Sequence, residues 1–380
     1  MPFLAADRVW ETSTTNGTGN MLLLGAVSGY RTFNSVYNNA VASYFKFHYA
    51  IVNRTGTQWE VGVGSLNLAN ELVREQVLVS TLGISATPET FTTGTKDIFV
   101  TLSAQTQTEA ITVPGGRLTL ETGVPASSSD QTAKSTLYYT PYSGNRIDLW
   151  DGSIWRPFLF AETSLSLILT NNKNYDVFGY INTGTNTLNL ELSTAWTTDT
   201  ARATALTTQD GILVKSGAST RRYLGTLRAT GTNTTEDSLR RRFVWNYYNQ
   251  ITRALFATET VDWTYDLTVM RQANNDATNQ VEVVVGALGY APSLLLRQLC
   301  FATAVCTLIS GIGINSTTVD TARSFSSIAL ANSYVALYVS LCQNAPLGYT
   351  YYTWLEQKSS GTATITWYGT VSGLSGTWAC

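Results

Sequence analysis

Two neighbouring stretches, residues 48–53 (HYAIVN) and 58–63 (QWEVGV), decide the fold class of this chain. The first is rich in β-branched and aromatic residues, and the second alternates polar and apolar side chains with a period of two, which is typical of β-strands. Similar runs recur at residues 98–102, 174–181, 281–285 and 362–368. The turn-forming pairs Asn16-Gly17, Asp151-Gly152 and Asp210-Gly211 separate such runs at close spacing. The sequence therefore predicts an all-β protein of two or three β-sandwich or jelly-roll-like modules in series.

Little helix is expected. The best helical candidates are residues 70–78 and 236–247, and the second is apolar at Leu239, Phe243 and Tyr247, with a spacing of four. No period of about 20 to 50 residues recurs along the chain, which disfavours a solenoid or a propeller.

Two shifts in composition suggest domain boundaries. A chain of 380 residues suits two or three domains of about 100 to 150 residues each. A polar segment at residues 103–112 runs into Pro114-Gly115-Gly116, and a second shift at residues 250–259 follows an aromatic-rich stretch. We therefore expect three modules: an N-terminal one at residues 1–105, a middle one at residues 113–250 and a C-terminal one at residues 258–380.

The charge content narrows the class of partner. Only 13% of the residues are charged, about half the usual ~25%, and the formal net charge is −2. An apolar fraction of 44% indicates a folded chain. Near-neutrality argues against nucleic acid, and we expect the cluster Arg240-Arg241-Arg242 to make local ion pairs or a subunit contact. No run approaches the ~20 apolar residues of a membrane helix, and the first ten residues lack the pattern of a secretory signal, so no membrane insertion is expected.

The residues that usually carry enzyme chemistry are sparse. The one histidine, His48, lies in an alternating run and is expected to be a strand residue. A second histidine for an HExxH zinc site is lacking, as is a Walker-type loop. The four cysteines, Cys300, Cys306, Cys342 and Cys380, have no CxxC spacing. They are expected to be buried thiols, with a bridge from Cys300 or Cys306 to Cys342 as the alternative. We predict no catalytic residue, no metal site and no cofactor.

Glycan hydrolysis is the main enzymatic alternative, because a glycosidase needs only two carboxylates about 5 to 9.5 Å apart. The acid pairs nearest to aromatic side chains are Asp148 with Asp151 and Asp262 with Asp266. Turn formation is a simpler explanation of Asp151-Gly152. The coil repeat of a β-helical depolymerase is also lacking from the sequence.

Several motifs resemble the shared modules of tailed-bacteriophage fibre and other virion proteins. In the first hundred residues they are 7–19 (DRVWETSTTNGTG), 25–30 (GAVSGY), 59–64 (WEVGVG) and 94–100 (GTKDIFV). In the middle they are 116–120 (GRLTL), 138–142 (YYTPY), 149–152 (LWDG), 175–178 (YDVF), 209–211 (QDG) and 222–226 (RYLGT). In the last third they are 263–265 (WTY), 271–274 (RQAN), 311–314 (GIGI), 348–349 (GY), 354–356 (WLE) and 367–369 (WYG).

The resemblance implies a structural component of the virion, assembled in the host cytoplasm and commonly trimeric. Its N-terminal module would attach to another virion protein of the tail, baseplate or capsid, and its C-terminal module would face the host. A tail or baseplate fibre that contacts a host surface glycan is the leading expectation, with a head-mounted capsid decoration protein or fibre as the alternative. Three copies would bury the apolar surface left over from each module and protect the edge strands from uncontrolled pairing, so we predict an elongated homotrimer.

Two groups of residues are candidates for contacts. Ten Trp, twenty Tyr and thirteen Phe exceed what alternating strands alone would need, and Tyr and Trp favour interfaces. We expect Tyr349, Tyr351 and Trp354 to form an aromatic surface or trimer contact, with packing in the core as the alternative. Host contacts usually lie in loops. The candidate receptor-binding residues are therefore Asn315, Ser316, Thr317, Lys358 and Ser359.

Overall fold

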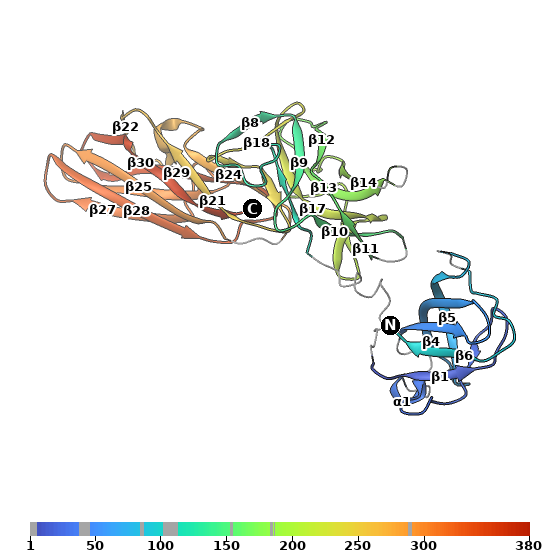
Figure 1. Cartoon of the computed structure of the whole chain (residues 1–380). Coiled ribbons are helices and arrows are strands. Elements are labelled where there is room, and N and C mark those ends of the chain that lie inside the picture. Colours follow the sequence, from blue (N-terminus) through green and yellow to red (C-terminus); the bar gives the residue numbers. More distant parts are fainter. Residues whose placement is uncertain are drawn as a thin grey trace. The chain divides into compact units, whose positions relative to one another are not determined.

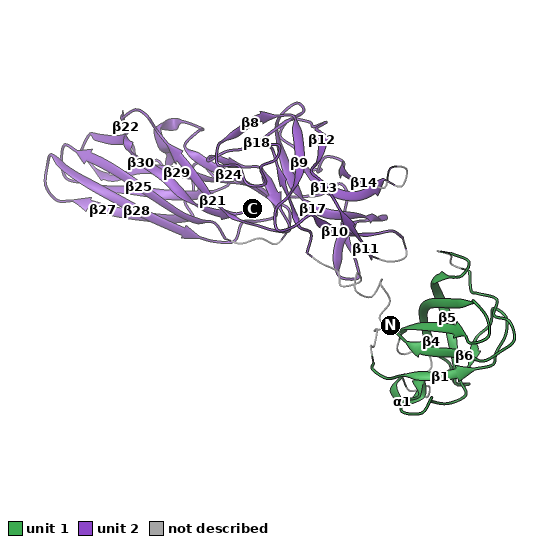
Figure 2. Cartoon of the chain, in the orientation of Figure 1, with its two compact units in different colours: residues 1–111 green, residues 112–380 purple. Residues whose placement is uncertain are grey.

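A computed structural model describes residues 6–37, 46–83, 87–101, 113–152, 155–182, 185, 187–287 and 291–380. The chain divides into two compact units, residues 1–111 and 112–380 (Figure 2). Almost all regular structure in both units is β-strand (Figure 1), which confirms the all-β prediction. The described helices are α1 (Phe33–Tyr37) and a 3-10 turn (Ala273–Asn275).

The first unit is built on one antiparallel sheet with the order β1-β6-β3-β4-β5-β2. Its strands are β1 (Trp10–Ser13), β2 (Met21–Leu22), β3 (Phe47–Asn53), β4 (Trp59–Leu66), β5 (Glu71–Ser80) and β6 (Lys96–Val100). The two stretches that predicted the fold class form β3 and β4, which pair from Phe47 opposite Gly64 to Val52 opposite Trp59. His48 is buried within β3, as expected of a strand residue. The core of the unit holds Phe33, Phe47, Tyr49, Ile51, Leu72 and Ile98.

The second unit contains one large sheet and three smaller ones. The large sheet has the main order β14-β13-β17-β18-β19-β24-β29-β26-β27. These strands are β13 (Asn174–Asn182), β14 (Thr187–Leu192), β17 (Ala218–Gly231), β18 (Thr234–Asp237), β19 (Arg241–Arg242), β24 (Gln280–Val285), β26 (Cys306–Ile314), β27 (Ala322–Ile328) and β29 (Gly348–Gly361). Short strands pair beside this path: β8 (Gln131–Lys134), β15 (Leu206–Gln209), β16 (Ile212–Lys215), β20 (Val244–Asn246) and β23 (Arg271–Gln272).

The other three sheets of the second unit are smaller. A three-stranded sheet consists of β7 (Gly116–Thr119), β9 (Thr136–Pro141) and β12 (Thr163–Ser166), and a hairpin consists of β10 (Arg146–Trp150) and β11 (Trp155–Leu159). A five-stranded antiparallel sheet has the order β21-β30-β25-β28, with β22 paired to β30. Its strands are β21 (Thr252–Thr258), β22 (Trp263–Thr264), β25 (Ser293–Ala302), β28 (Ser333–Cys342) and β30 (Ile365–Ala379).

Two hydrophobic cores hold the second unit together. One contains Leu137, Ile147, Val177 and Leu227 from the predicted middle module. The other fills the space between the five-stranded sheet and strands β24, β29 and β26, and it includes Trp354, Trp367 and Trp378. This second core also takes in Phe178, Tyr223 and Trp245 from the middle segment. The predicted segments 113–250 and 258–380 therefore lie in one compact unit and both contribute to the second core, and their treatment as separate modules stays a prediction.

A polar contact also joins these two segments. The Arg117 guanidinium of β7 is buried and donates to the carbonyl oxygens of Asn249 and Cys380, the latter at 3.1 Å from both of its terminal nitrogens. A buried guanidinium without such acceptors would be costly, so this contact fixes the last strand against β7.

The Asp210-Gly211 pair forms the hairpin turn that the sequence predicts. Asp210 and Gly211 both have positive φ, +52° and +83°, and they link β15 to β16 with Gln209 directly opposite Ile212. This is the two-residue hairpin that an Asp-Gly pair favours, because both central residues of its turn need the left-handed region.

The two helical candidates from the sequence were wrong. Residues 70–78 lie largely in β5, and residues 236–247 form parts of β18, β19 and β20. In the second segment, Phe243, Val244, Trp245 and Asn246 are all buried in succession, which requires a strand covered on both faces. The spacing of four among its apolar residues did not indicate a helical face, because tertiary packing overrides local propensity.

The arginine cluster forms local ion pairs, as expected, at two of its three members. Arg241 lies 3.3 Å from Glu236 and 3.0 Å from Glu282, and Arg242 lies 3.0 Å from Asp237. All four cysteines are free thiols, and Cys342 is exposed whereas the other three are buried.

Candidate interaction surface

One face of the five-stranded sheet points away from the core and is unusually apolar. Its outward side chains alternate with core residues along each strand, as the pleat requires. The pairing places Leu295 opposite Ser340 and Ser375, and it places Arg297 opposite Tyr338 and Gly373. We define the outer face as the outward side chains Phe256, Leu295, Arg297, Leu299, Phe301, Tyr334, Ala336, Tyr338 and Tyr368.

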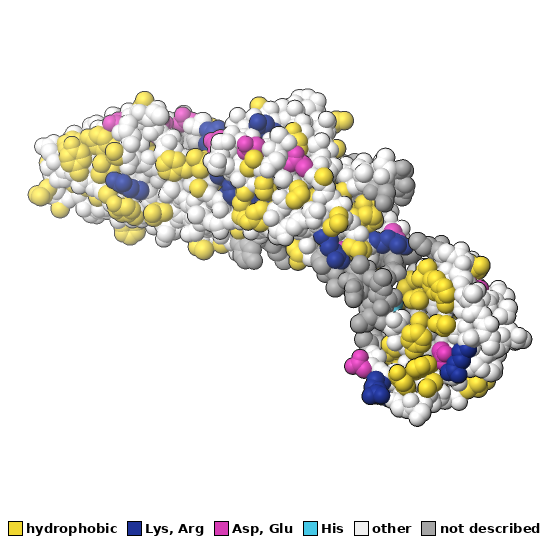
Figure 3. Space-filling view, in the orientation of Figure 1, with side chains coloured by type: hydrophobic (Ala, Val, Ile, Leu, Met, Phe, Trp, Pro, Cys, Tyr) yellow, Lys and Arg dark blue, Asp and Glu magenta, His cyan; other side chains and the backbone are white. Residues whose placement is uncertain are grey.

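Large apolar side chains on the outer face are well exposed. Leu295 and Phe256 are each 45% exposed, Tyr338 is 56% exposed and Tyr334 is 65% exposed. The rings form a cluster: Tyr334 lies 5.0 Å from Phe301 and 5.8 Å from Tyr368, measured between ring centroids. Figure 3 shows hydrophobic side chains gathered over this part of the unit with few charged groups among them. Exposed apolar patches of this kind mark interaction sites.

Charge is almost absent from the outer face. Among the described outward residues of β21, β25, β28 and β30, Arg297 is the one charged side chain. The other polar groups are Ser, Thr and Tyr hydroxyls, such as Ser340 and Ser375. Interfaces between subunits show the same depletion of charge with enrichment of aromatic residues and arginine.

The predicted receptor-binding residues fall into two separate places. Asn315, Ser316 and Thr317 form the loop between β26 and β27, and Asn315 and Thr317 are exposed. The Asn315 amide oxygen accepts a hydrogen bond from the Tyr351 backbone N–H at 3.0 Å, and its backbone N–H donates to the Tyr351 carbonyl oxygen at 3.0 Å. The structure therefore brings this loop next to one of the predicted aromatic residues.

Lys358 and Ser359 lie at the opposite end of the same strand pair. Ser360, next to them, pairs with Thr307 at the start of β26, whereas Tyr352 pairs with Ile314 at its end. Ser359 is exposed, but Lys358 is buried and its Nζ donates to the Ala363 carbonyl oxygen at 3.1 Å. The Lys358 ammonium group thus satisfies a turn carbonyl inside the unit, Ser359 is the exposed member of this pair, and a receptor contact at these two residues stays a prediction.

The aromatic stretch on β29 divides between the two faces of the strand. Tyr349 and Tyr351 are half-buried, with ring centroids 6.0 Å apart. The Tyr349 hydroxyl donates to Glu282 at 2.7 Å, and the Arg228 guanidinium lies 3.6 Å from its ring centroid. Trp354 is fully buried and packs edge-to-face on Trp263 at 5.7 Å. Trp354 is therefore a core residue, as the alternative expectation held, and not a surface contact of this chain.

The sequence of β25 contained a feature that indicates the outer face: this strand is apolar on both of its faces. The stretch SLLLRQLCFA of β25 places apolar residues on both of its faces, since Leu294, Leu296 and Cys300 point inward while Leu295, Leu299 and Phe301 point outward. A strand that is apolar on both faces is typical of a sheet covered on both sides.

Motifs from the last third converge on a buried carboxylate. Glu356 of β29 is fully buried and accepts hydrogen bonds from Trp263 Nε1 at 2.7 Å, Arg271 Nε at 2.9 Å and the Asn274 backbone N–H at 3.1 Å. The Arg271 guanidinium also lies 3.6 Å from the Tyr265 ring centroid. This network ties the segment around residues 263–274 to the core, which gives these motif residues a structural role.

Burial raises the pKa of Glu356 from 4.5 to about 7, although Arg271 and Trp263 act in the opposite direction. The folded state therefore holds this proton more tightly than the unfolded state does. The resulting stabilisation is fully present below pH ~4.5 and is lost as the pH rises through about 7, to a total of about 3 kcal/mol. Urea unfolding of the second unit between pH 4.5 and 8 should reveal this slope, and Glu356→Gln should flatten it. An unchanged slope in the variant would contradict this role.

Three of the four acids that sequence analysis weighed for hydrolysis have partners within the second unit. Asp148 is buried and lies 3.2 Å from Arg146, and Asp151 is ion-paired with Arg156. Asp262 is exposed and accepts a hydrogen bond from the Thr370 hydroxyl at 3.4 Å. Within the described ranges, no group of three or more His, Cys, Asp or Glu side chains is placed to hold a metal ion. None of the described helices has the length and apolar character to span a membrane.

Comparison with known proteins leaves the family open. No family model and no curated protein matches the chain. Among solved structures, the Eiger TNF of S. frugiperda is 8% identical over 34% of this chain and 92% of its own, with a TM-score of 0.24. An insecticidal delta-endotoxin of Bacillus thuringiensis is 9% identical over 98% of this chain and 60% of its own, with a TM-score of 0.21. A family 43 arabinoxylan arabinofuranohydrolase of Bacillus subtilis is 10% identical over 97% of this chain and 79% of its own, with a TM-score of 0.20. Likenesses at such low TM-scores carry no argument about the function of this chain.

Proposed function

We propose that this protein is a non-enzymatic structural component of a tailed-phage virion, which assembles as a homotrimer and contacts the host surface. The observation that carries the proposal is the outer face, a sheet surface with exposed Leu, Phe and Tyr side chains and a single charge. Leaving such a surface in water costs about 25 cal/mol per Å² of apolar area, so covering it with another subunit is favourable. The motif resemblance implies that the assembly has three copies and that it belongs to a virion.

The outer face suits a second copy of the same chain better than a variable partner. Its aromatic side chains stand on paired strands of a rigid sheet and not on loops, which favours a permanent and preformed contact. The single Arg297 can be satisfied by hydroxyl or carbonyl oxygens of a neighbouring subunit without a complementary acidic patch. A jelly-roll-like arrangement of the last segment fits this mode of assembly.

Within the virion, a tail or baseplate fibre is the leading assignment, and a head-mounted fibre is the alternative. Residues 1–111 would attach to another virion protein, while the second unit would contact a surface glycan. Several weak sites on one particle would act together, because avidity lengthens the time that the particle stays bound to the host surface by about 10²-fold or more without new contacts. Counting copies per particle separates the two assignments: a capsid decoration requires dozens to hundreds of copies, and a fibre far fewer.

Light scattering of the recombinant chain tests the assembly state. At micromolar concentration the molar mass should be about three times the 41.4 kDa of one chain. A clean monomer under the same conditions would remove the physical basis of the proposal, because the outer face would then be stable in water.

A further inference from the structure

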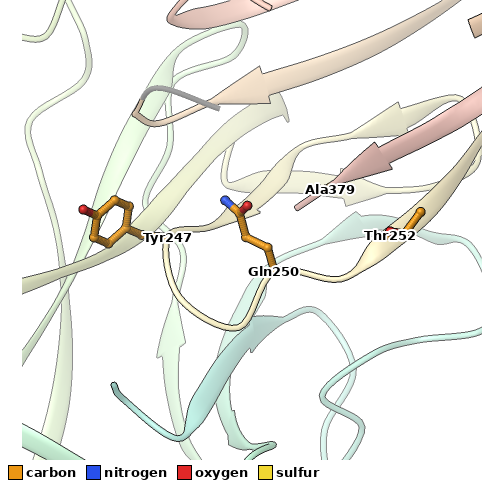
Figure 4. A pocket seen from close by; sticks show the side chains of 4 residues that line it. All are labelled: Tyr247, Gln250, Thr252 and Ala379. Atoms are coloured by element: carbon orange, nitrogen blue, oxygen red, sulfur yellow. The ribbon is translucent and has the colours of Figure 1, made fainter. Parts of the chain in front are cut away.

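A hollow of about 620 Å³ opens at the end of strands β21 and β30, where the predicted middle and C-terminal segments meet. It is lined by Tyr247, Gln250, Thr252 and Ala379. In Figure 4 the Gln250 amide lies between the Tyr247 ring on one side and Thr252 on the other. An aromatic ring beside an amide and a hydroxyl is a combination that suits a saccharide, whose C–H faces stack on rings while its hydroxyls need polar partners.

The Tyr247 ring is held in place before any ligand arrives. Its centroid lies 4.8 Å from that of Tyr248, 5.5 Å from that of Tyr223 and 6.1 Å from that of Trp245. The ring is nevertheless only half-buried, so part of it faces the hollow. A rigid aromatic side chain lowers the entropic cost of binding.

The loop that carries Gln250 is fixed as well. The Asn249 side-chain amide donates to the carbonyl oxygens of Pro114 at 2.5 Å and Gly116 at 3.0 Å. The Ser143 hydroxyl donates to the Asn249 amide oxygen at 3.0 Å. These contacts anchor the turn between β20 and β21 to the β7 region, so the floor of the hollow does not depend on a mobile loop.

Polar atoms at the hollow have unused hydrogen-bonding capacity. Gln250 Nε2 donates to the Asn246 carbonyl oxygen at 2.8 Å, which orients the amide, whereas its Oε1 accepts no hydrogen bond from any residue in the described part of the chain. Nor does the exposed Thr252 hydroxyl bond to any of those residues. Gln250 Oε1 is thus available as an acceptor, and the Thr252 hydroxyl is available both to donate to and to accept from sugar hydroxyls.

A second hollow, of about 450 Å³, shares the Tyr247 ring and has a different character. Its lining includes Leu206, Leu213, Ala287 and Leu347. The Arg202 guanidinium also lines it, but both of its partners are internal: the Asp176 carboxylate at 2.7 and 3.0 Å, and the Gly286 carbonyl oxygen. Because that charge is already paired, the second hollow offers an apolar surface and not an anion site.

We propose that the two hollows flanking Tyr247 bind a neutral N-acetylated saccharide. One sugar ring stacks on Tyr247, its hydroxyls bond to Gln250 Oε1 and the Thr252 hydroxyl, and the methyl of the acetamido group enters the apolar hollow. The inference rests on the proposed function and gives the host glycan a site and a chemical class. Because Thr252 and Ala379 stand on the same side of the five-stranded sheet as Phe256, it requires that the neighbouring subunits leave this end of the sheet uncovered. It moves that site away from residues 315–317 and 358–359, where the sequence placed it.

Saturation-transfer NMR on the full chain tests the site with two probes, the trisaccharide of β-1,4-linked N-acetylglucosamine and cellotriose, which lacks the acetamido groups. The acetylated probe should bind with a Kd on the order of 1 mM, and cellotriose at least about fivefold more weakly. Equal binding of the two probes contradicts the role of the apolar hollow. No transfer to either probe overturns the site.

Variants localise the effect. Gln250→Ala should weaken binding about fivefold, and Thr252→Trp, which fills the first hollow from an exposed position, should abolish it. The matched control is Thr232→Trp, at an exposed threonine in the turn between β17 and β18, which should bind as the wild type does. Wild-type affinity in Thr252→Trp overturns the site. Light scattering on the same samples keeps the two proposals distinct: an intact trimer without binding overturns this site alone, and a binding monomer overturns the trimer alone.

Discussion

Replacing Glu60 with alanine is expected to destabilise the first unit strongly while the stability of the second unit is unchanged. Glu60 is fully buried on β4, and it accepts hydrogen bonds from the Tyr49 hydroxyl at 2.7 Å, from Arg74 Nε at 2.8 Å and from the Glu89 backbone N–H at 2.7 Å. Arg74 is buried with it and makes its ion pair to this carboxylate. The variant therefore leaves an uncompensated guanidinium inside the unit.

The expected loss is large compared with the stability of a small domain. Removing one partner of a buried ion pair costs about 3 to 5 kcal/mol, and small domains have a free energy of unfolding of about 5 to 15 kcal/mol. After the change, Arg74 keeps only carbonyl acceptors, such as that of Glu89 at 2.9 Å, which do not neutralise its charge. Hydrogen exchange followed by mass spectrometry should show lost protection in peptides from residues 46–83 and unchanged protection in the second unit.

A surface ion pair in the same unit is the matched control. Arg54 lies 2.7 Å from Asp97, but its side chain is 48% exposed. Arg54→Ala should leave the stability of the first unit close to that of the wild type, because the Arg54 guanidinium is already solvated and Asp97 keeps its hydrogen bond from Trp10 Nε1. If Glu60→Ala were as mild as Arg54→Ala, the buried pair would not be what stabilises the first unit.

Placing a carboxylate on the outer face is expected to convert the trimer into monomers. Leu295 is the central choice, since it stands on β25 between Ser340 and Ser375 with its side chain 45% exposed in the single chain. In the single chain, Leu295→Glu places its charge in water and should fold normally. In the trimer the same charge is taken out of water three times, at a cost of several kcal/mol each.

Sedimentation velocity should detect the change directly. The variant should sediment as one chain of 41.4 kDa at a concentration where the wild type is trimeric, with unchanged circular dichroism. Ile168→Glu is the control, because Ile168 is an 81% exposed apolar residue outside the five-stranded sheet. A trimer that survives Leu295→Glu would show that the subunits meet elsewhere.

Strand content and turns could be predicted from the sequence because they depend on neighbouring residues. Residues 48–53 and 58–63 became β3 and β4, and Asp210-Gly211 became the hairpin between β15 and β16. Residues 236–247 could not be assigned in the same way. Their consecutive burial depends on strands β17 and β24, which lie outside any local window.

The candidate sites show the same limit. Asn315 and Tyr351 were singled out separately, and the register of β26 with β29 makes them neighbours, but that same register carries Ser359 to the far end of the strands. Lys358 and Trp354 turned inward because even-numbered residues of that part of β29 face the core. Tyr247, Gln250 and Thr252 were not singled out as a site, since only the turn between β20 and β21 brings them around one hollow.

By itself, the sequence determined that this chain is built of β-strands and has few charged residues, because side-chain alternation and turn residues act over a few positions. Only the tertiary structure decided which apolar faces became cores and which became the outer face. Side-chain alternation predicts that Leu295 and Phe301 lie on the same side of β25. Whether the core of the unit covers that side depends on pairing with strands that are dozens of residues away in the sequence.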